Sequence, residues 1–357
     1  MFLFLAILVF LLMHGAVVFW FAQNTPGLAL TALTKLLPLI LTVLYIALFI
    51  LAKKIHSWPL ETFLLTYLGI LFLGFCIVCI FVLLAIILKF LHLALPLNLG
   101  FLALGILVFL TLISLFTAAK TPTVKNINIA SPGIRGEVKI AFVADTHFGA
   151  TVGIKRAESL NKILQQIKPD LIVFSGDIFE TDSKDSAPFA EILARILPGK
   201  KFGVFGNHEY YQGLQNARQS FKKAGINLLE NESTLFNNIN IIGVNDIKTA
   251  RISKQNFENI LKENVKPNTF NLLLTHTPLH FDTAAQNGIN LMLSGHTHRG
   301  QIWPFNFLVR LTTPYVYGHF KTGNSDLIVT SGTFFWGPPM RLFTNNEITL
   351  ITLKGVK

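Results

Sequence analysis

The first third of the chain is a series of apolar stretches interrupted by short polar breaks. Each stretch is about 20 residues long, which is enough for a helix to cross the hydrocarbon core of a bilayer. The breaks contain charged residues, proline or glycine, as is typical of turns at a membrane interface. The sequence therefore predicts about four membrane-spanning helices, within Phe2–Phe21, Leu36–Ala52, Thr62–Leu88 and Leu99–Ala119.

From Thr121 onward the pattern changes to short apolar runs that alternate with amphipathic stretches. Val138–Ala144 is typical of a buried strand, and Ile154–Ile167 carries apolar residues at helical spacing. Alternating strands and helices, followed by more closely spaced strands, indicate a mixed α/β sandwich. The other helices are expected at Ala187–Leu197 and Leu214–Ala224. The other strands are expected at Leu171–Phe174, Phe202–Phe205, Ile239–Val244, Phe270–Thr275, Leu291–Leu293, Leu327–Thr330 and Ile348–Leu353.

This change of pattern divides the chain into a transmembrane domain over 1–120, a linker over 121–136 and an α/β domain over 137–357. The first 120 residues have a net charge of +4, and the rest of the chain, with 25 basic and 18 acidic side chains, has a net charge of +7. A mildly basic domain suits an anionic substrate or membrane lipids. No basic run is interleaved with aromatic residues, so nucleic acid is not an expected partner.

The lysines at the ends of the apolar stretches predict the orientation in the membrane. With four spans, both termini lie on one side, and that side carries four of these lysines against two on the other. The positive-inside rule then places the α/β domain in the cytoplasm, and the expected location is the bacterial inner membrane. The first side has Lys53, Lys54, Lys120 and Lys125, and the second has Lys35 and Lys89.

Five short polar motifs follow expected strands, at the edge of an α/β sheet where ligands usually bind. Each motif alone is weak, because aspartate, asparagine and glycine are common turn residues. Together they offer two carboxylates, one amide and four imidazoles, a mixture suited to Mn²⁺, Fe²⁺ or Zn²⁺. In extended backbone, residues two apart in DTH and HTH would point the same way. The seven candidate ligands are Asp145, His147, Asp177, Asn207, His276, His296 and His298.

The order of these motifs (DxH, GD, GNHE, H, GHxH) resembles the calcineurin-like metallophosphoesterase superfamily over residues 137–357. The stretch GHTHRGQ at 295–301 and the late Gly337–Arg341 are similar to its membrane-associated bacterial branch. The resemblance implies a four-layer α/β/β/α sandwich with two divalent metal ions held by loops at strand ends. One departure is Arg299, which stands where many relatives of this branch have glycine.

The resemblance also implies a role for each candidate residue. Asp177 would bridge the two metals and is a catalytic candidate together with His208, which would act as a general acid or stabilise charge on the phosphate. The first metal would be bound by Asp145, His147, Asp177 and His298. The second metal would be bound by Asp177, Asn207, His276 and His296.

These residues predict hydrolysis of a phosphodiester, diphosphate or phosphomonoester by attack of a metal-bound hydroxide, because two cations can activate water and offset the phosphate charge. The bacterial branch suggests a lipid-linked substrate such as UDP-diacylglucosamine. Two alternatives stay open: a phosphodiesterase for soluble nucleotides, and a membrane scaffold or sensor with an idle phosphoesterase fold.

Two arginines are candidates for contacting a substrate phosphate, since guanidinium groups match phosphate oxygens. They are Arg299 and Arg341, and surface ion pairing is the alternative for both. Five aromatic residues near the last motif could line an apolar groove or pack in the core. They are Trp303, Phe305, Phe334, Phe335 and Trp336.

Overall fold

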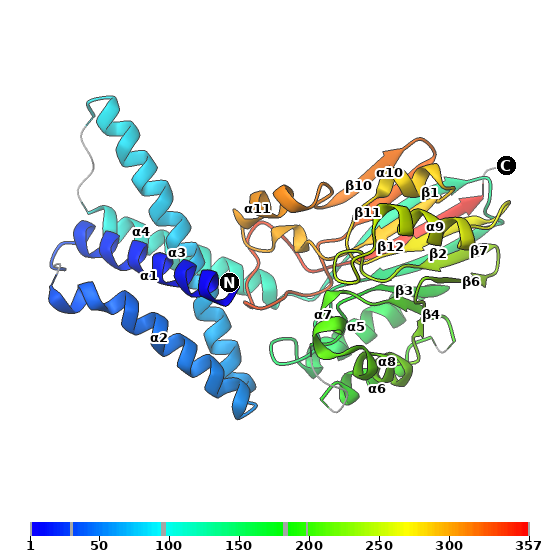
Figure 1. The fold of residues 1–357 in the computed structure, drawn as a ribbon, viewed down its shortest axis with the longest axis horizontal. Coiled ribbons are helices and arrows are strands. Elements are labelled where there is room, and N and C mark those ends of the chain that lie inside the picture. The colour runs from blue at the N-terminus through cyan, green and yellow to red at the C-terminus, as the bar shows by residue number, and fades with distance from the viewer. Residues whose placement is uncertain (1, 29–30, 94–97, 181–184, 198, 356–357) are drawn as a thin grey trace. The chain divides into compact units, whose positions relative to one another are not determined.

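The computed structural model describes residues 2–28, 31–93, 98–180, 185–197 and 199–355. The chain separates into two compact units (Figure 1). The helical unit comprises Met1–Thr117 and Gly337–Leu342, and the sheet unit comprises Ala118–Trp336 and Phe343–Lys357. The chain therefore passes from one unit to the other three times.

The four apolar stretches form four helices, each long and apolar enough to cross a membrane. This confirms the prediction from the hydrophobic pattern. Many of their large apolar side chains are exposed, as expected for surfaces that face lipid rather than water. The helices are α1 (Phe2–Asn24), α2 (Ala32–Lys54), α3 (Trp58–Phe90) and α4 (Leu99–Ala119).

A short segment from the end of the chain, Gly337–Leu342, also belongs to the helical unit. The side chain of Met340 lies against Gly69 of α3. The backbone N–H of Arg341 donates to the carbonyl of Ser114 in α4 at 2.9 Å. This membership cannot be predicted from the sequence, because the segment has neither the length nor the periodicity of a membrane helix.

The sheet unit contains two six-stranded sheets. The first has the order β1-β12-β2-β3-β4-β5, and the second has the order β10-β11-β9-β8-β7-β6. The strands of the first sheet are β1 (Thr123–Ser131), β12 (Glu347–Gly355), β2 (Glu137–Val143), β3 (Leu171–Ser175), β4 (Lys201–Val204) and β5 (Asn227–Leu228). Those of the second are β10 (Gly318–Thr322), β11 (Ser325–Val329), β9 (Leu291–Ser294), β8 (Phe270–Leu274), β7 (Ile239–Gly243) and β6 (Glu232–Phe236).

The two sheets pack face to face and helices cover their outer faces, which confirms the four-layer α/β/β/α sandwich (Figure 1). Alternation along β8 illustrates why: Leu272 and Leu274 lie in the core between the sheets, whereas Leu273 packs under α9 and α10. The helices on that side are α9 (Lys254–Asn264) and α10 (Phe281–Gln286). Those on the other side are α5 (Ile154–Ile167), α6 (Ala187–Ala194) and α8 (Leu214–Lys223), and three further helices lie near strand ends: α7 (Asn207–Gln212), η1 (His298–Gly300) and α11 (Phe305–Thr312).

The range 121–136, predicted as a linker, instead contains β1, which pairs in parallel with β12 along its whole length. Polar and apolar residues alternate in this strand, so that Ile127 and Ile129 pack on the core between the sheets while their neighbours face out. Such alternation is typical of a strand that is buried on one face only. The sheet unit thus starts directly after α4.

Candidate metal centre

The five motifs meet at one edge of the two sheets. Strands β2, β3 and β4 are parallel in the first sheet, and β7, β8 and β9 are parallel in the second. The first predicted ligand of each motif comes two or three residues after such a strand ends, so all five motifs lie at carboxyl ends. The hydroxyl of Ser175, at the end of β3, donates to the carbonyl of Thr275 across the sandwich at 2.8 Å and joins the two sheets beside the site.

Five of the seven predicted ligands have left-handed backbone, with φ between 45° and 71°. The expectation of extended backbone in DTH and HTH is therefore wrong. Residues other than glycine seldom adopt this conformation, and it is often found at functional sites that surrounding structure holds in place. The five are Asp145, His147, Asp177, His296 and His298. The turns separate His296 from His298, so that each histidine joins a different group of ligands.

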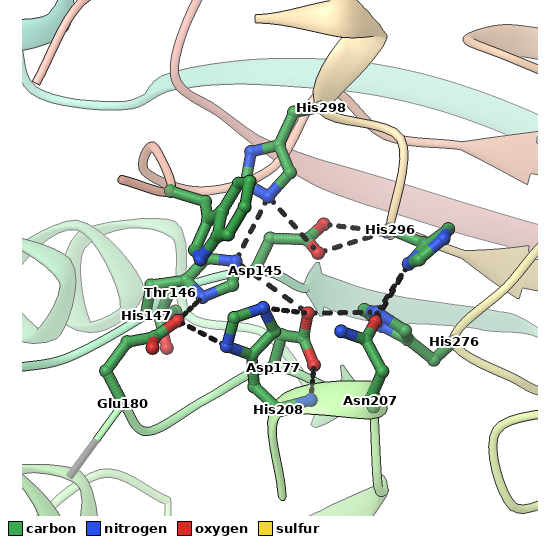
Figure 2. A network of polar contacts seen from close by, with 12 residues as sticks. Asp145, Thr146, His147, Asp177, Glu180, Asn207, His208, His276, His296 and His298 are labelled. Carbon is green, nitrogen blue, oxygen red and sulfur yellow. Dashed lines mark hydrogen bonds and ion pairs between the residues drawn. The ribbon is translucent and has the colours of Figure 1, made fainter. Parts of the chain in front are cut away.

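The first group consists of Asp145, His147 and His298 (Figure 2). The Nε2 atoms of the two histidines are 3.0 Å apart, and that of His298 is 3.6 Å from Asp145 Oδ1. His147 Nδ1 donates to the carboxylate of Glu180, which leaves a lone pair on Nε2 in the neutral ring. The backbone N–H of His296 donates to both oxygens of Asp145, at 3.0 and 3.2 Å, and orients that carboxylate.

The second group consists of Asp177, Asn207, His276 and His296. Nε2 of His276 lies 3.1 Å from Asp177 Oδ2, 3.1 Å from Asn207 Oδ1 and 3.2 Å from His296 Nδ1. His276 Nδ1 donates to the carbonyl of Ser175 at 2.8 Å, so Nε2 is the nitrogen that faces the other members of the group. Burial would lower the pKa of His276, but the carboxylates of Asp177 and Asp145 raise it well above its usual value, so a cation bound here would replace the proton on Nε2. Two side-chain oxygens and two imidazole nitrogens therefore converge on one point, and such a cluster can hold a cation.

Asp177 faces both groups with the same oxygen. Its Oδ2 is 3.1 Å from His276 Nε2 in the second group and 3.8 Å from His147 Nε2 in the first. Burial would raise the pKa of this carboxyl, but the imidazoles of His276 and His208 outweigh that effect and hold the pKa well below its usual value. The carboxylate is therefore ionised at neutral pH, as a ligand shared by two cations must be.

His208 lies beside Asp177 without belonging to either group. Its Nδ1 is 2.8 Å from Glu180 Oε1, and its Nε2 is 3.9 Å from Asp177 Oδ2 (Figure 2). Burial would lower the pKa of His208, but the carboxylates of Asp177 and Glu180 raise it to about 9. The ring is therefore protonated at neutral pH and can donate a hydrogen bond or a proton.

Two glutamates to which the sequence motifs assign no role, Glu180 and Glu209, complete the site. Glu180 pairs with His147 and His208, so it orients one predicted ligand and one catalytic candidate. Glu209 is fully buried and accepts hydrogen bonds from the backbone N–H groups of Gly206, Asp177 and Ile178, at 2.7, 2.9 and 2.8 Å. Two features of the sequence could have pointed to these residues. Glu209 is the fourth residue of the GNHE motif, and Glu180 comes three residues after Asp177.

We expect Glu209→Gln to lower both the melting temperature and the metal content. The new amide nitrogen would face backbone donors, and each buried donor left without a partner costs about 1–3 kcal/mol. The measurements are thermal unfolding in detergent and elemental analysis of the purified variant.

Glu258→Gln is the matched control, because Glu258 pairs with Lys262 at 2.6 Å across the surface of α9 and belongs to none of the motifs. If Glu209→Gln has the same melting temperature and metal content as this control, the backbone hydrogen bonds to Glu209 are not needed to position Asp177.

The glycines of two motifs are needed for close packing. A Cβ on Gly206 would collide with the Asp177 carboxylate, and one on Gly295 would collide with the Asp145 carboxylate. Any other residue would displace a predicted ligand. Close packing against the two carboxylates thus explains why glycine stands at these positions of GN and GH, independently of any turn.

The two arginines predicted to contact substrate have different surroundings. Arg299 is exposed and follows the predicted ligand His298 directly, and its guanidinium lies over the ring of Tyr317, with 4.6 Å to the centroid. Arg341 is fully buried and belongs to the helical unit. Arg299 therefore lies at the surface next to a predicted ligand, whereas the buried guanidinium of Arg341 offers no surface to a substrate phosphate.

The aromatic residues near the last motif do not act as one cluster. Phe334 and Phe335 are fully buried and pack in the core, whereas Trp303, Phe305 and Trp336 are exposed. Trp336 lies edge-on to His208, with ring centroids 5.6 Å apart. Core packing therefore accounts for two of the five residues, and the three others are at the surface.

A strand-end cluster of histidine and carboxylate groups, built on an α/β/β/α sandwich, is the site of a metal-binding hydrolase. The comparisons with known proteins agree. The family model described as calcineurin-like phosphoesterase matches residues 138–300. An uncharacterized metallophosphoesterase of Campylobacter jejuni is 33% identical over 261 residues, which cover 70% of this chain and 68% of that protein.

Two further relatives extend the comparison. An uncharacterized metallophosphoesterase of Aquifex aeolicus is 33% identical over 229 residues, 61% of this chain and 86% of that protein. A Bos taurus protein named as a transmembrane protein with metallophosphoesterase domain is 30% identical over 271 residues, 69% of this chain and 60% of that protein. The chain belongs to the calcineurin-like phosphoesterase family, as its motifs predicted, and it is a phosphoester hydrolase associated with a membrane.

Proposed function

We propose that this protein hydrolyses a phosphoester bond with two divalent metal ions bound at the strand ends, and that its substrate is presented at the membrane. The observation that carries the proposal is the convergence of Asp177 Oδ2, Asn207 Oδ1, His276 Nε2 and His296 Nδ1, in which His276 Nε2 lies within 3.2 Å of each of the others. The mixture of oxygen and imidazole nitrogen fits Mn²⁺, Fe²⁺ or Zn²⁺.

In this proposal some side chains bind the metal ions and others contact the substrate. The first group with Asp177 would hold one ion, and the second group, which shares Asp177, would hold the other. Bound divalent cations supply Lewis acidity, which lowers the pKa of water and offsets the phosphate charge. His208 would bind a phosphate oxygen and give its proton to the leaving oxygen, while Glu180 holds its ring through Nδ1.

The proposal that the substrate is lipid-linked is supported by the four candidate membrane spans in the same chain. UDP-diacylglucosamine is one such substrate, with a diphosphate and two acyl chains. The arrangement of lysines supports a cytoplasmic catalytic domain at the bacterial inner membrane, since α2 ends at Lys54 and α4 ends just before Lys120, on the same side.

The test is a substrate panel assayed on the full-length protein in detergent with Mn²⁺, Zn²⁺ or Mg²⁺. The panel compares UDP-diacylglucosamine, phospholipids, cyclic nucleotides and a chromogenic phosphodiester. We expect activity that a chelator removes and one of the metals restores, with the highest kcat/KM on a lipid-linked phosphoester.

Two other results would have clear meanings. A preference for cyclic nucleotides would contradict a lipid substrate and favour a phosphodiesterase for soluble nucleotides. Less than one divalent ion per chain, with no turnover of any substrate, would favour a scaffold or sensor with an idle fold.

A further inference from the structure

Helix α11 (Phe305–Thr312) has none of its eight residues buried. Large apolar side chains dominate it, and most of their surface is open: Phe307 is 57% exposed, Leu308 54% and Leu311 80%. A surface helix of a water-soluble domain normally buries its apolar residues against the core. Phe307, Leu308 and Leu311 therefore leave most of their apolar surface uncovered within the described residues.

The single asparagine of α11 faces the protein. Gly300 packs against the backbone and Cβ of Asn306, and the amide oxygen of Asn306 is buried. Phe307, Leu308 and Leu311 lie on the side of the helix away from Asn306, since successive residues are about 100° apart. The side of the helix with Asn306 thus faces the protein, and the side with Phe307, Leu308 and Leu311 faces outward.

Two aromatic residues from neighbouring loops extend this apolar face. The rings of Trp303 and Phe343 are nearly perpendicular, with centroids 6.0 Å apart. Both are exposed, Phe343 by 67%. The α11 surface is defined here as Trp303, Phe305, Phe307, Leu308, Leu311 and Phe343. A group of exposed apolar side chains on one short stretch of chain, as here, is typical of a site of contact with a membrane or another protein.

We propose that the α11 surface inserts into the interfacial region of the lipid bilayer and holds the sheet unit against the membrane. Covalent linkage supports the bilayer as the occupant. Phe343 directly follows Leu342, which belongs to the membrane-spanning helical unit, so its Cα is about 3.8 Å from that of Leu342. A bilayer is thus necessarily close to this part of the chain.

The composition of the α11 surface also fits a bilayer. Tryptophan is enriched where membranes meet water, and amphipathic helices with phenylalanine and leucine lie in that plane. Arg310 is exposed at the edge of the apolar face, where it can reach lipid phosphates. The α11 surface begins five residues after the predicted ligand His298, so docking would bring the metal centre close to lipid headgroups. The proposal does not depend on which phosphoester is hydrolysed.

The test uses a fluorophore that responds to polarity, attached at a single cysteine in the full-length protein. Cys76 and Cys79, the chain's two cysteines, are replaced by serine, and Leu311→Cys is labelled. The matched control is Lys262→Cys, exposed on α9 outside the α11 surface. Each protein is reconstituted as one copy per lipid nanodisc and exposed to a quencher carried on lipid chains or to iodide in the water.

We expect the label at position 311 to emit at shorter wavelength and to lose most of its emission to the lipid-borne quencher, with little effect of iodide. The label at position 262 should respond to iodide and not to the lipid-borne quencher. Iodide quenching of equal extent at both positions would overturn the proposal. Protection of position 311 that appears only with two copies per disc would overturn it in favour of a contact between copies of this chain.

Discussion

Asp177→Asn should nearly abolish phosphoester hydrolysis and lower the number of bound divalent ions. The substitution removes the negative charge that both ligand groups share, and it leaves only one oxygen on the side chain. If the amide nitrogen takes the place of Oδ2, 3.1 Å from His276 Nε2, it carries hydrogens in place of the lone pair that would bind a cation. Loss of a residue that merely supports a ligand costs about 10–100-fold, and we expect loss of this shared ligand to exceed that range.

The measurements for this variant are kcat/KM on the best substrate of the panel and metal content by elemental analysis. Asp282→Asn is the control, because Asp282 is exposed on α10 and belongs to none of the five motifs. A folded Asp177→Asn protein with wild-type turnover would refute the shared-ligand role. A variant with normal metal content but no turnover would refute the expected effect on binding while leaving a role in the reaction.

His208→Asn should reduce kcat by about 10²–10⁴-fold, the usual contribution of a general acid. In contrast to Asp177→Asn, it should retain its full metal content, because His208 is not assigned as a ligand. His208 does lie close enough to His147 and Asp177 to form a third possible group of metal ligands. A variant that loses metal together with activity would therefore show that His208 is a ligand.

The pH dependence of kcat is a second test of the role of His208. The pKa of His208 is raised to about 9 by its carboxylate neighbours, so the protonated form is present at neutral pH and is lost as pH rises through that value. Bound cations would lower this pKa, and the alkaline decline of wild-type kcat should thus fall at or below about pH 9. His208→Asn should lack this decline.

The control for the pH experiment is His280→Asn. His280 also has left-handed backbone, which asparagine tolerates well, and its ring packs on Phe257 rather than in the metal centre. An alkaline decline that is unchanged in His208→Asn would assign the titration to another group.

The sequence was informative where one physical rule dominates. Twenty apolar residues without a charge have few alternatives to a membrane helix, and strands buried on both faces, such as Leu171–Ser175, are recognised from composition alone. Parallel strands then place their carboxyl ends at one edge, so that Asp145, Asp177 and His276 are brought together without any knowledge of their contacts. The positions of the ligands followed from the strands.

Features that depend on tertiary contacts were not predictable. The left-handed backbone at Asp145 and His296 is stabilised by hydrogen bonds between loops that are far apart in sequence. Glu209 resembles an ordinary residue in the first turn of a helix until the backbone of the Asp177 loop is seen to surround it. Strand β1 was interpreted as a linker because alternation over nine residues is weak evidence without its partner β12.

The division of the chain also limits how the enzyme can be taken apart. Because Gly337–Leu342 packs among the membrane helices, a single cleavage at Lys120 would cut the peptide link after α4 without releasing the sheet unit. The inserted loop would still anchor it. Conversely, a fragment that starts at Ala118 would carry Met340 and Leu342 into water with no helices to cover them, and would tend to aggregate. The catalytic unit and the helical unit thus depend on each other to fold, and neither can be exchanged between proteins as an independent domain.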